Sequence, residues 1–295
     1  MVSIIIVHYH ADEELFRCLE SIQKHKPKIS FEVIVVDNDE EIRIKQELKH
    51  KFSWVRYVKS SGNNGFGSGN NLGAKHAKGD YLFFLNPDTR IFPGTVDELV
   101  AFLEKNKDAG VVAPQLLHSD KTPFEQQGCM LLNPVRGMIV LSFINKIFPN
   151  NPVSKTYWQA GWDKTKLKEV DVVPGTAFMI RKKLYEEIQG FDQNFFLYFE
   201  EFDLCKRIRE KGYKLFITPK AKIIHLWGKG GTGETDNINT IYKQSRIYYF
   251  KKHYGIFNAL LVEAFARFGK KQFFFIAAIF FVVVALLLFR SLEEK

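Results

Sequence analysis

Cysteine is scarce in this chain, and the few cysteines lie far apart. The 295 residues include only Cys18, Cys129 and Cys205, and no two of them have CxxC spacing. An odd number at such separations argues against a disulfide framework or a zinc site and favours a reducing compartment. The first residues, MVSIIIVHYH, also lack the basic stretch that opens a cleavable signal peptide, so we expect none.

The common phosphate-binding motifs are also missing. Residues 60–80, SSGNNGFGSGNNLGAKHAKGD, are rich in glycine, but they do not have GxGxxG spacing after a first strand, and no Lys–Ser/Thr pair follows them. Two alternatives are left. The segment is an ordinary turn, or it opens a helix whose free N–H groups suit an anion or a ribose hydroxyl.

The excess of positive charge lies near the C-terminus. The chain has a net charge of +9, and residues 239–271 hold seven lysines and arginines against one acid. They precede an apolar run, Phe273–Phe289, so the pattern favours a membrane anchor over nucleic-acid binding. Seventeen apolar residues are at the short end of the roughly 17–25 that span a bilayer, so a buried helix or an in-plane anchor are alternatives. Lys270 and Lys271 predict that the N-terminal side faces the cytoplasm.

Two further segments are unusually apolar. Apolar residues recur at helical spacing from Ile256 to Phe268, which is typical of a helix lying at a membrane interface. We therefore predict a soluble domain over residues 1–255 and an anchoring tail over 256–295. Residues 135–149 are either an ordinary core helix or a surface that faces lipid or the acceptor.

Short β-branched runs alternate with helical patterns along the first 114 residues. Strands are predicted at 2–9, 31–38, 54–60, 80–88 and 109–114, and helices at 11–25, 40–52, about 70–77 and 94–106. This alternation predicts an α/β fold, a parallel sheet with helices on both faces. Ligands of such sheets bind at the carboxyl ends of the strands. The residues expected at that edge are His8–His10, Asp37–Asn38, the glycine-rich loop and Asn86–Asp88.

Two groups of acids are candidates for chemistry. Asp88 follows an apolar strand in LFFLNPDTR, where it is either a turn residue or a ligand for a hard divalent cation. Glu200, Glu201 and Asp203 begin a predicted helix, where the helix dipole favours acids in any case. The surrounding aromatic residues would instead desolvate a carboxylate and raise its pKa, as a general base requires. Positions 200 and 203 share a helix face, whereas 201 points about 100° away.

Eight segments in order resemble a known family. They are VSIIIVHYH, VIVVDND, NNGFGSGNNLG, FFLNPDT, VPGTAFMIRK, GFDQNFFLYFEEFDLCKR, GYKLFITPKAKIIHLWGKG and RIYYFKKHYG. Together they resemble the family 2 glycosyltransferases, in particular the rhamnosyltransferase-like branch of cell-surface polysaccharide synthesis. The resemblance runs from Val2 to about Gly255. It implies a GT-A fold, in which a mixed, mostly parallel sheet is flanked by helices.

The resemblance also implies roles for single residues. Asp88 and His225 would hold Mg²⁺ or Mn²⁺ on the diphosphate. Glu201 matches the acid that deprotonates the acceptor. A Glu-Glu pair stands here where the family has Glu-Asp, so Glu200 and Asp203 are alternatives. The residues implied in binding the nucleotide-sugar are His8, Tyr9, Asp37, Asn64, Gly65, Asn71, Asn86, Gly175 and Ala177.

The implied reaction is an inverting transfer of a sugar from a nucleotide diphosphate donor. The expected donor is dTDP-rhamnose, with a UDP-hexose or UDP-galactofuranose as alternatives, and the expected acceptor is a lipid-linked saccharide at the cytoplasmic face of the inner membrane. A non-catalytic nucleotide-sugar-binding scaffold is the competing hypothesis. A nucleotidyltransferase would need a basic glycine-rich loop after the first strand, and HYHADEEL offers none.

Overall fold

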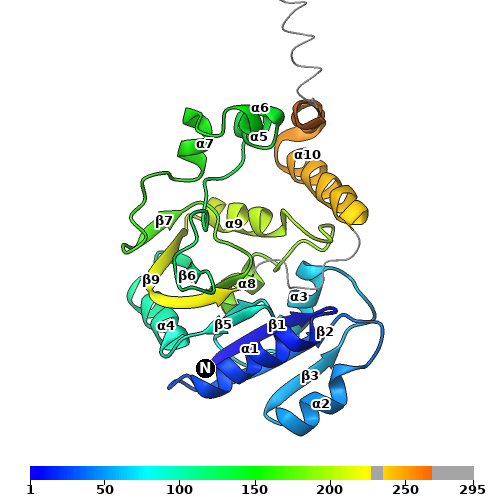
Figure 1. Ribbon diagram of the computed structural model, residues 1–295, viewed down its shortest axis with the longest axis vertical. Helices are drawn as coiled ribbons and strands as arrows, with labels where there is room; N and C mark the ends of the chain where they lie inside the picture. Colours follow the sequence, from blue (N-terminus) through cyan, green and yellow to red (C-terminus); the bar gives the residue numbers. More distant parts are fainter. Residues whose placement is uncertain (227–234, 268–295) are drawn as a thin grey trace, which may run out of the picture. The chain divides into compact units, whose positions relative to one another are not determined.

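The computed structural model describes residues 1–226 and 235–267, and they belong to two compact units (Figure 1). Unit 1 comprises Met1–Leu131 and Trp158–Tyr249, and unit 2 comprises Leu132–Tyr157 and Phe250–Lys295. The boundary expected after residue 255 coincides with a break in α10 (Thr235–Arg267), where Gly255 has a non-helical backbone (φ 84°, ψ 164°) that separates two helical parts.

The first half of unit 1 is a parallel sheet. Its strands are β1 (Val2–His8), β2 (Phe31–Asp37), β3 (Val55–Lys59) and β4 (Tyr81–Leu85), in the order β3-β2-β1-β4. The predicted α/β alternation is confirmed here. Parallel pairing places His8 directly beside Asp37, at the carboxyl ends of β1 and β2.

The second half makes the sheet mixed. Strand β8 (Ala177–Arg181) pairs antiparallel with β4 and with β6 (Ala109–Leu117), and β9 (Lys214–His225) runs parallel to β6. Two short strands, β5 (Thr89–Ile91) and β7 (Lys168–Val170), pair antiparallel with β9. The ends of strands that are far apart in the sequence therefore meet at one edge of the sheet.

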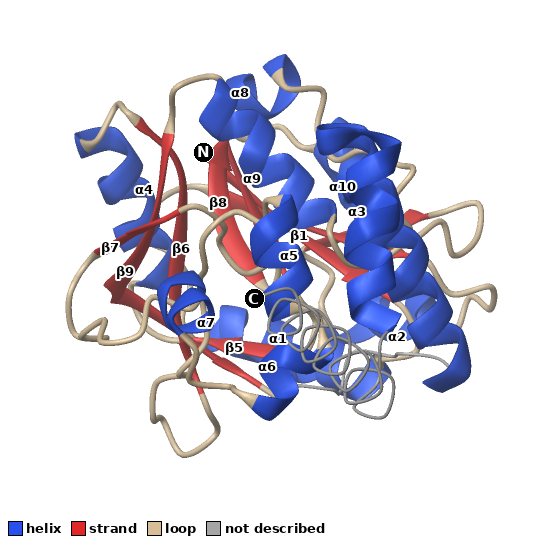
Figure 2. Cartoon of the chain, turned by 90° about the horizontal axis from the view of Figure 1, so that it is seen from above, coloured by secondary structure: helices blue, strands red, loops and turns tan. Residues whose placement is uncertain are grey.

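Helices cover both faces of this sheet (Figure 2). Side chains alternate along a strand, so Ile4 and Ile6 belong to the core under α1 (Asp12–Lys24), α2 (Ile44–Lys51) and α4 (Thr95–Lys105). Ile5 faces the other side, where α3 (Phe66–His76) packs through its glycines. Helix α3 starts four residues earlier than predicted because Gly65 provides its cap at φ 87°. Helices α8 (Lys182–Glu187) and α9 (Glu200–Glu210) and the first part of α10, up to Tyr249, also belong to unit 1.

Unit 2 consists of α5 (Pro134–Val140), α6 (Phe143–Ile147), α7 (Pro152–Tyr157) and the last part of α10. Gly137 lets α5 approach the ring of Phe250, because a Cβ at Gly137 would lie 3.1 Å from its Cε1 atom. The Tyr254 hydroxyl donates to the Leu132 carbonyl at 2.9 Å. Residues 135–149 are thus two short helices rather than one.

The helices that the structure describes, up to Arg267, include none with the length and apolarity needed to cross a bilayer. The predicted anchor, Phe273–Phe289, lies outside the described residues.

Candidate active site

Asp88 and His225 meet because β5 pairs with the end of β9. The register sets Thr89 opposite His225, and the Leu226 N–H donates to the Asp88 carbonyl at 2.9 Å. The Oδ2 atom of Asp88 then lies 3.3 Å from Nε2 of His225, and only 2% and 9% of the two residues are exposed. The family resemblance implied this pair, whose members are 137 positions apart in the chain, and the structure brings the two side chains together.

The same corner holds oxygen atoms that the described part of the chain leaves without a hydrogen bond. They are Oδ1 of Asp88 and Oδ1 of Asn86, both buried. A buried polar atom without a partner is costly, so each is suited to a ligand from outside the chain. Carboxylate and amide oxygens are ligands that Mg²⁺ and Mn²⁺ accept, so the residues present fit the expected cation.

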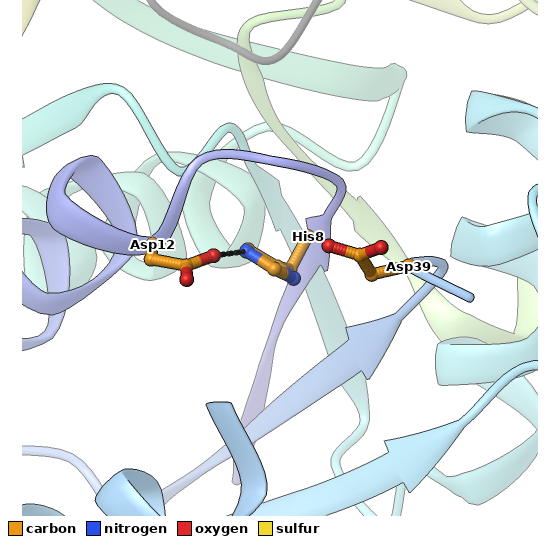
Figure 3. A group of neighbouring side chains, drawn as sticks. All are labelled: His8, Asp12 and Asp39. Atoms are coloured by element: carbon orange, nitrogen blue, oxygen red, sulfur yellow. Dashed lines mark hydrogen bonds and ion pairs between the residues drawn. The ribbon is translucent and has the colours of Figure 1, made fainter. Parts of the chain in front are cut away.

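A second group with ligand-type atoms lies at the ends of β1 and β2. His8, Asp12 and Asp39 offer atoms within 4.8 Å of one another (Figure 3). These atoms already have protein partners: His8 Nε2 is 2.8 Å from Asp12, and Asp39 accepts from Arg43 at 2.7 Å. This group therefore supports the edge of the sheet, whereas the Asp88 corner is the one with buried oxygen atoms that lack a partner in the described chain.

Asp37 is held in place by its neighbours on this edge. His8 Nδ1 lies 3.2 Å from its carboxylate, Tyr57 donates at 2.7 Å, and the Asp39 N–H donates at 3.0 Å. Burial acts to raise the pKa of Asp37, but these hydrogen bonds outweigh it and lower the pKa below its usual value. His8 is fully buried with both ring nitrogens engaged, so it supports Asp37 and is not placed to contact a nucleotide. Tyr9, partly exposed, lies with its ring 4.2 Å from that of His10.

The glycines of the loop make room for protein rather than for a ligand. A Cβ at Gly65 would meet the backbone of Phe196, and one at Gly67 would lie 3.0 Å from Cβ of Phe191. Farther along α3, a Cβ at Gly73 would lie 3.2 Å from the side chain of Val36. The close approach that these glycines allow is therefore an approach between parts of the chain. The loop itself stays at the carboxyl end of β3, where the Ser60 N–H donates to the Asp37 carbonyl.

Asn64 and Asn71 lie beside a cavity of about 950 Å³ between α3 and α8. Asn64 is exposed and donates to Ser61 at 3.0 Å. Asn71 is committed within the fold, because its side-chain oxygen accepts from Tyr185 at 2.5 Å and its amide donates to the Phe191 carbonyl at 2.8 Å. Within the described chain, the lining of this cavity includes neither Asp88 nor the acids of α9, so it is separate from the chemistry.

The N-terminus of α9 follows a strained turn. Tyr198 and Phe199 both have left-handed backbones, with φ of 69° and 66°. Bulky residues adopt this conformation at a cost of order 1–3 kcal/mol each, and such strain gathers at functional sites. The turn directs Glu200 and Glu201 inward, and the Oε2 atom of each is buried with no hydrogen-bond partner in the described chain.

Asp203 has a different role from the two glutamates. It is fully buried and accepts from Arg207 at 2.8 Å. Arg207 also donates to the carbonyls of Ile188 and Gly190, at 2.5 and 2.8 Å. This network fastens α9 to the preceding loop, so of the three acids Asp203 is the one already in use.

Burial raises the pKa of Glu201 to about 7. Burial also raises the pKa of Glu200, and the nearby charge of Glu201 raises it further. A carboxyl group with a pKa near 7 can be ionised at working pH and still be basic enough to accept a proton. Glu201 is partly exposed by surface area, whereas only 4% of Glu200 is exposed, so Glu201 is the more accessible of the two.

One short segment links the two halves of the site. The Asn86 N–H donates to the Thr176 carbonyl at 2.8 Å, and Ala177 is paired with Leu85. On the other side of Thr176, a Cβ at Gly175 would lie 3.7 Å from Cβ of Glu201. The segment around Gly175 therefore joins the Asp88 corner to the candidate base.

Comparison with known proteins settles the family. The sequence profile of glycosyl transferase family 2 matches residues 3–189. This chain is a family 2 glycosyltransferase. The glycosyltransferase is 25% identical over 228 residues to the low-salt glycan biosynthesis hexosyltransferase Agl10 of Haloferax volcanii, covering 76% of this chain and 66% of that protein. It is 22% identical over 273 residues, 88% of either chain, to the N-acetylglucosaminyl-diphospho-decaprenol L-rhamnosyltransferase of Mycobacterium tuberculosis. These relatives support the rhamnosyltransferase-like branch.

Among solved structures, this glycosyltransferase is similar in fold to GalNAc-T7, crystallised with UDP, GalNAc and Mn²⁺. The TM-score is 0.59 at 17% identity, with 85% of this chain and 49% of the other covered. At that identity the likeness shows the fold alone, and it confirms the GT-A-like α/β architecture.

Sequence reasoning missed Tyr57 and Arg207 as supports of the site. The only signal was their position, Tyr57 in the middle of a predicted strand and Arg207 four residues after an acid.

Proposed function

We propose that this glycosyltransferase moves a sugar, L-rhamnose first among the candidates, from a nucleoside diphosphate to a hydroxyl group of a lipid-linked saccharide. The observation that carries the proposal is the buried carboxyl group of Glu201, which has a raised pKa and an unpartnered Oε2 atom beside Gly175. The names of the relatives motivate the sugar and the acceptor.

The proposed chemistry is a single displacement with inversion. Glu201 accepts the proton of the acceptor hydroxyl while the oxygen of that hydroxyl forms a bond to the anomeric carbon. The bond from that carbon to the diphosphate oxygen breaks, and the nucleoside diphosphate leaves with the electron pair. Asp88 and His225 would hold Mg²⁺ or Mn²⁺, which when bound would offset the negative charge of the diphosphate. The corner formed by Asn86, Gly175 and Ala177 would hold the sugar between these groups.

The C-terminal sequence supports the proposed acceptor and its location. The described part of unit 2 and the run Phe273–Phe289 combine positive charge with apolar residues, which suits a site at the cytoplasmic face of the inner membrane. A lipid-linked sugar would reach the enzyme there without leaving the bilayer.

The test is a transfer assay with dTDP-rhamnose, a UDP-hexose and UDP-galactofuranose as donors and a polyprenyl-diphosphate-linked sugar as acceptor. Removing a general base typically lowers the rate by 10²–10⁴-fold, so Glu201→Gln should fall in that range while leaving donor binding unchanged. Glu200→Gln is the matched control and should lose less than tenfold. Transfer by Glu201→Gln near the wild-type rate would overturn the proposed base, and binding of all donors without any transfer would favour the scaffold hypothesis.

A further inference from the structure

Exposed apolar side chains are concentrated in unit 2. The described residues include eight large hydrophobic side chains with high exposure, and five belong to this unit: Val135, Phe148, Ile256, Phe257 and Leu260. Scattered exposed apolar residues are normal on soluble proteins, but a gathering on one small unit marks an interaction surface.

The last part of α10 carries the densest of these surfaces. Ile256, Phe257 and Leu260 are 54%, 76% and 59% exposed. Their spacing places them on one side of the helix, while Ala259 and Val262 on the other side are almost fully buried. The helix thus packs through one face and leaves a second apolar face open. We call Ile256, Phe257 and Leu260 the α10 face.

Positive charge predominates on unit 2, the unit that carries the α10 face. The described residues of unit 2 hold six lysines and arginines against one acid, Glu263. Glu263 is itself buried and accepts from Arg267 at 2.6 Å, so it presents little negative charge. Lys251 and Lys252, both exposed, directly precede the α10 face in the chain. More than half of the net charge of +9 therefore lies on this unit.

We propose that the α10 face docks on an anionic lipid bilayer, with Phe257 and Leu260 entering the boundary between headgroups and acyl chains. An apolar helix face bordered by cations binds such surfaces through buried apolar area and through attraction to acidic lipids. A second copy of the chain is a poorer occupant, because it would bring the same positive charge against itself. The inference adds a docking surface to the proposed function and is independent of the residues proposed for sugar transfer.

The test measures immersion of the α10 face directly. The native cysteines are all buried, so a cysteine introduced as Phe257→Cys can be labelled selectively with an environment-sensitive fluorophore in the full chain. With vesicles of phosphatidylcholine and phosphatidylglycerol, the label should shift to the blue and be quenched by lipids that carry a quencher on the acyl chain. The control label at Ile42→Cys, an exposed apolar position of unit 1, should show neither change. A label at 257 that stays in water while the protein is on vesicles, or no vesicle binding at all, overturns the proposal.

A second, independent test reverses the charge of lysines near the α10 face. The double variant Lys251→Glu/Lys252→Glu should lower quenching at position 257 at least twofold in the anionic vesicles, because each lysine near the surface contributes to attraction. Lys49→Glu/Lys105→Glu makes the same change in charge on exposed sites of unit 1 and should leave quenching unchanged. Equal effects of the two pairs would contradict specific docking. Shielding of the label without vesicles, growing with protein concentration, would assign the face to self-association. The assay contains no sugar donor, so its failure is distinct from failure of the proposed transfer.

Discussion

The backbone of Gly65 packs directly against the carbonyl group of Phe196. A Cβ at Gly65 would lie 2.8 Å from the carbonyl carbon of Phe196 and closer still to its oxygen. The same oxygen accepts from the Phe66 N–H at 2.9 Å. The glycine-rich loop is thereby attached to the segment that leads into Glu200 and Glu201, so the two ends of the site share one backbone contact.

Replacing Gly65 with alanine should destabilise the fold strongly. The left-handed backbone at φ 87° costs roughly 1–2 kcal/mol for an L-residue, and the clash with Phe196 adds about 1–3 kcal/mol. Gly212→Ala is the matched control, since Gly212 has φ 86° and open space around it. Denaturant unfolding should show the larger loss of free energy for Gly65→Ala, and equal losses would refute the contact.

The dependence of rate on pH should report the pKa of Glu201. Because burial raises this pKa to about 7, the carboxyl group is protonated below pH 7 and unable to accept a proton. The turnover rate should therefore rise about tenfold per pH unit up to pH 6 and level off above 7. The residual turnover rate of Glu201→Gln should lack this rise with pH, whereas the rate of Glu200→Gln should keep it. If the rise with pH persists in Glu201→Gln, the titrating group is a different one.

Stability should depend on pH in the opposite direction from that of an ordinary carboxylate. The pKa of Glu201 is about 7 in the folded chain against an ordinary value of 4.5, so the folded state binds more protons between these pH values. Its contribution to stability is then complete below pH 4.5 and is lost as the pH rises through 7.

Glu201→Gln should accordingly be more stable than the wild type at pH 8, by about 2 kcal/mol, and nearly equal to it at pH 4.5. The full pKa difference converts to roughly 3 kcal/mol, but the side chain keeps some contact with solvent. Thermal unfolding at the two pH values measures the difference. Exposed Glu98→Gln is the control, and a similar gain in that variant would rule out the buried charge as the cause.

The two groups of ligand-type atoms can be told apart by metal binding. With MnCl₂ alone at a hundredfold excess over Kd, the wild type should gain about 2.7 kcal/mol of stability. Asp88→Asn should remove most of this gain, because it takes away an anionic ligand atom at the preferred corner. Asp12→Asn should retain it, since His8 and Arg43 already pair the second group. The reverse pattern, measured by thermal unfolding, would move the cation to His8, Asp12 and Asp39.

Much of the candidate site was predictable because local patterns place it. Strand ends at His8 and Asp37, and the turn after β4 that carries Asp88, follow from apolar runs that stop at polar residues, and parallel pairing gathers such ends at one edge. The resemblance to the family, rather than any local pattern, implied that Asp88 and His225 would share a cation. Local patterns could not predict the partners of single atoms, because these come from segments far away in the chain. The Asn71 side chain, for example, is used by Tyr185 and Phe191.

The sequence by itself determined the order of strands and helices, the kinds of side chain at each strand end and the membership of the family. These depend on periodicity and on short motifs, which are local properties. Only the tertiary structure decided which acids are in use: Arg207 pairs with Asp203, whereas the Oε2 atoms of Glu200 and Glu201 have no hydrogen-bond partner in the described residues. The tertiary structure also showed that the glycines of residues 60–80 allow close packing against other segments of the chain. The Asp203–Arg207 pair is four positions apart on one helix, but the contacts of Gly65 and Gly67 join segments more than a hundred residues apart, and no local pattern encodes such contacts.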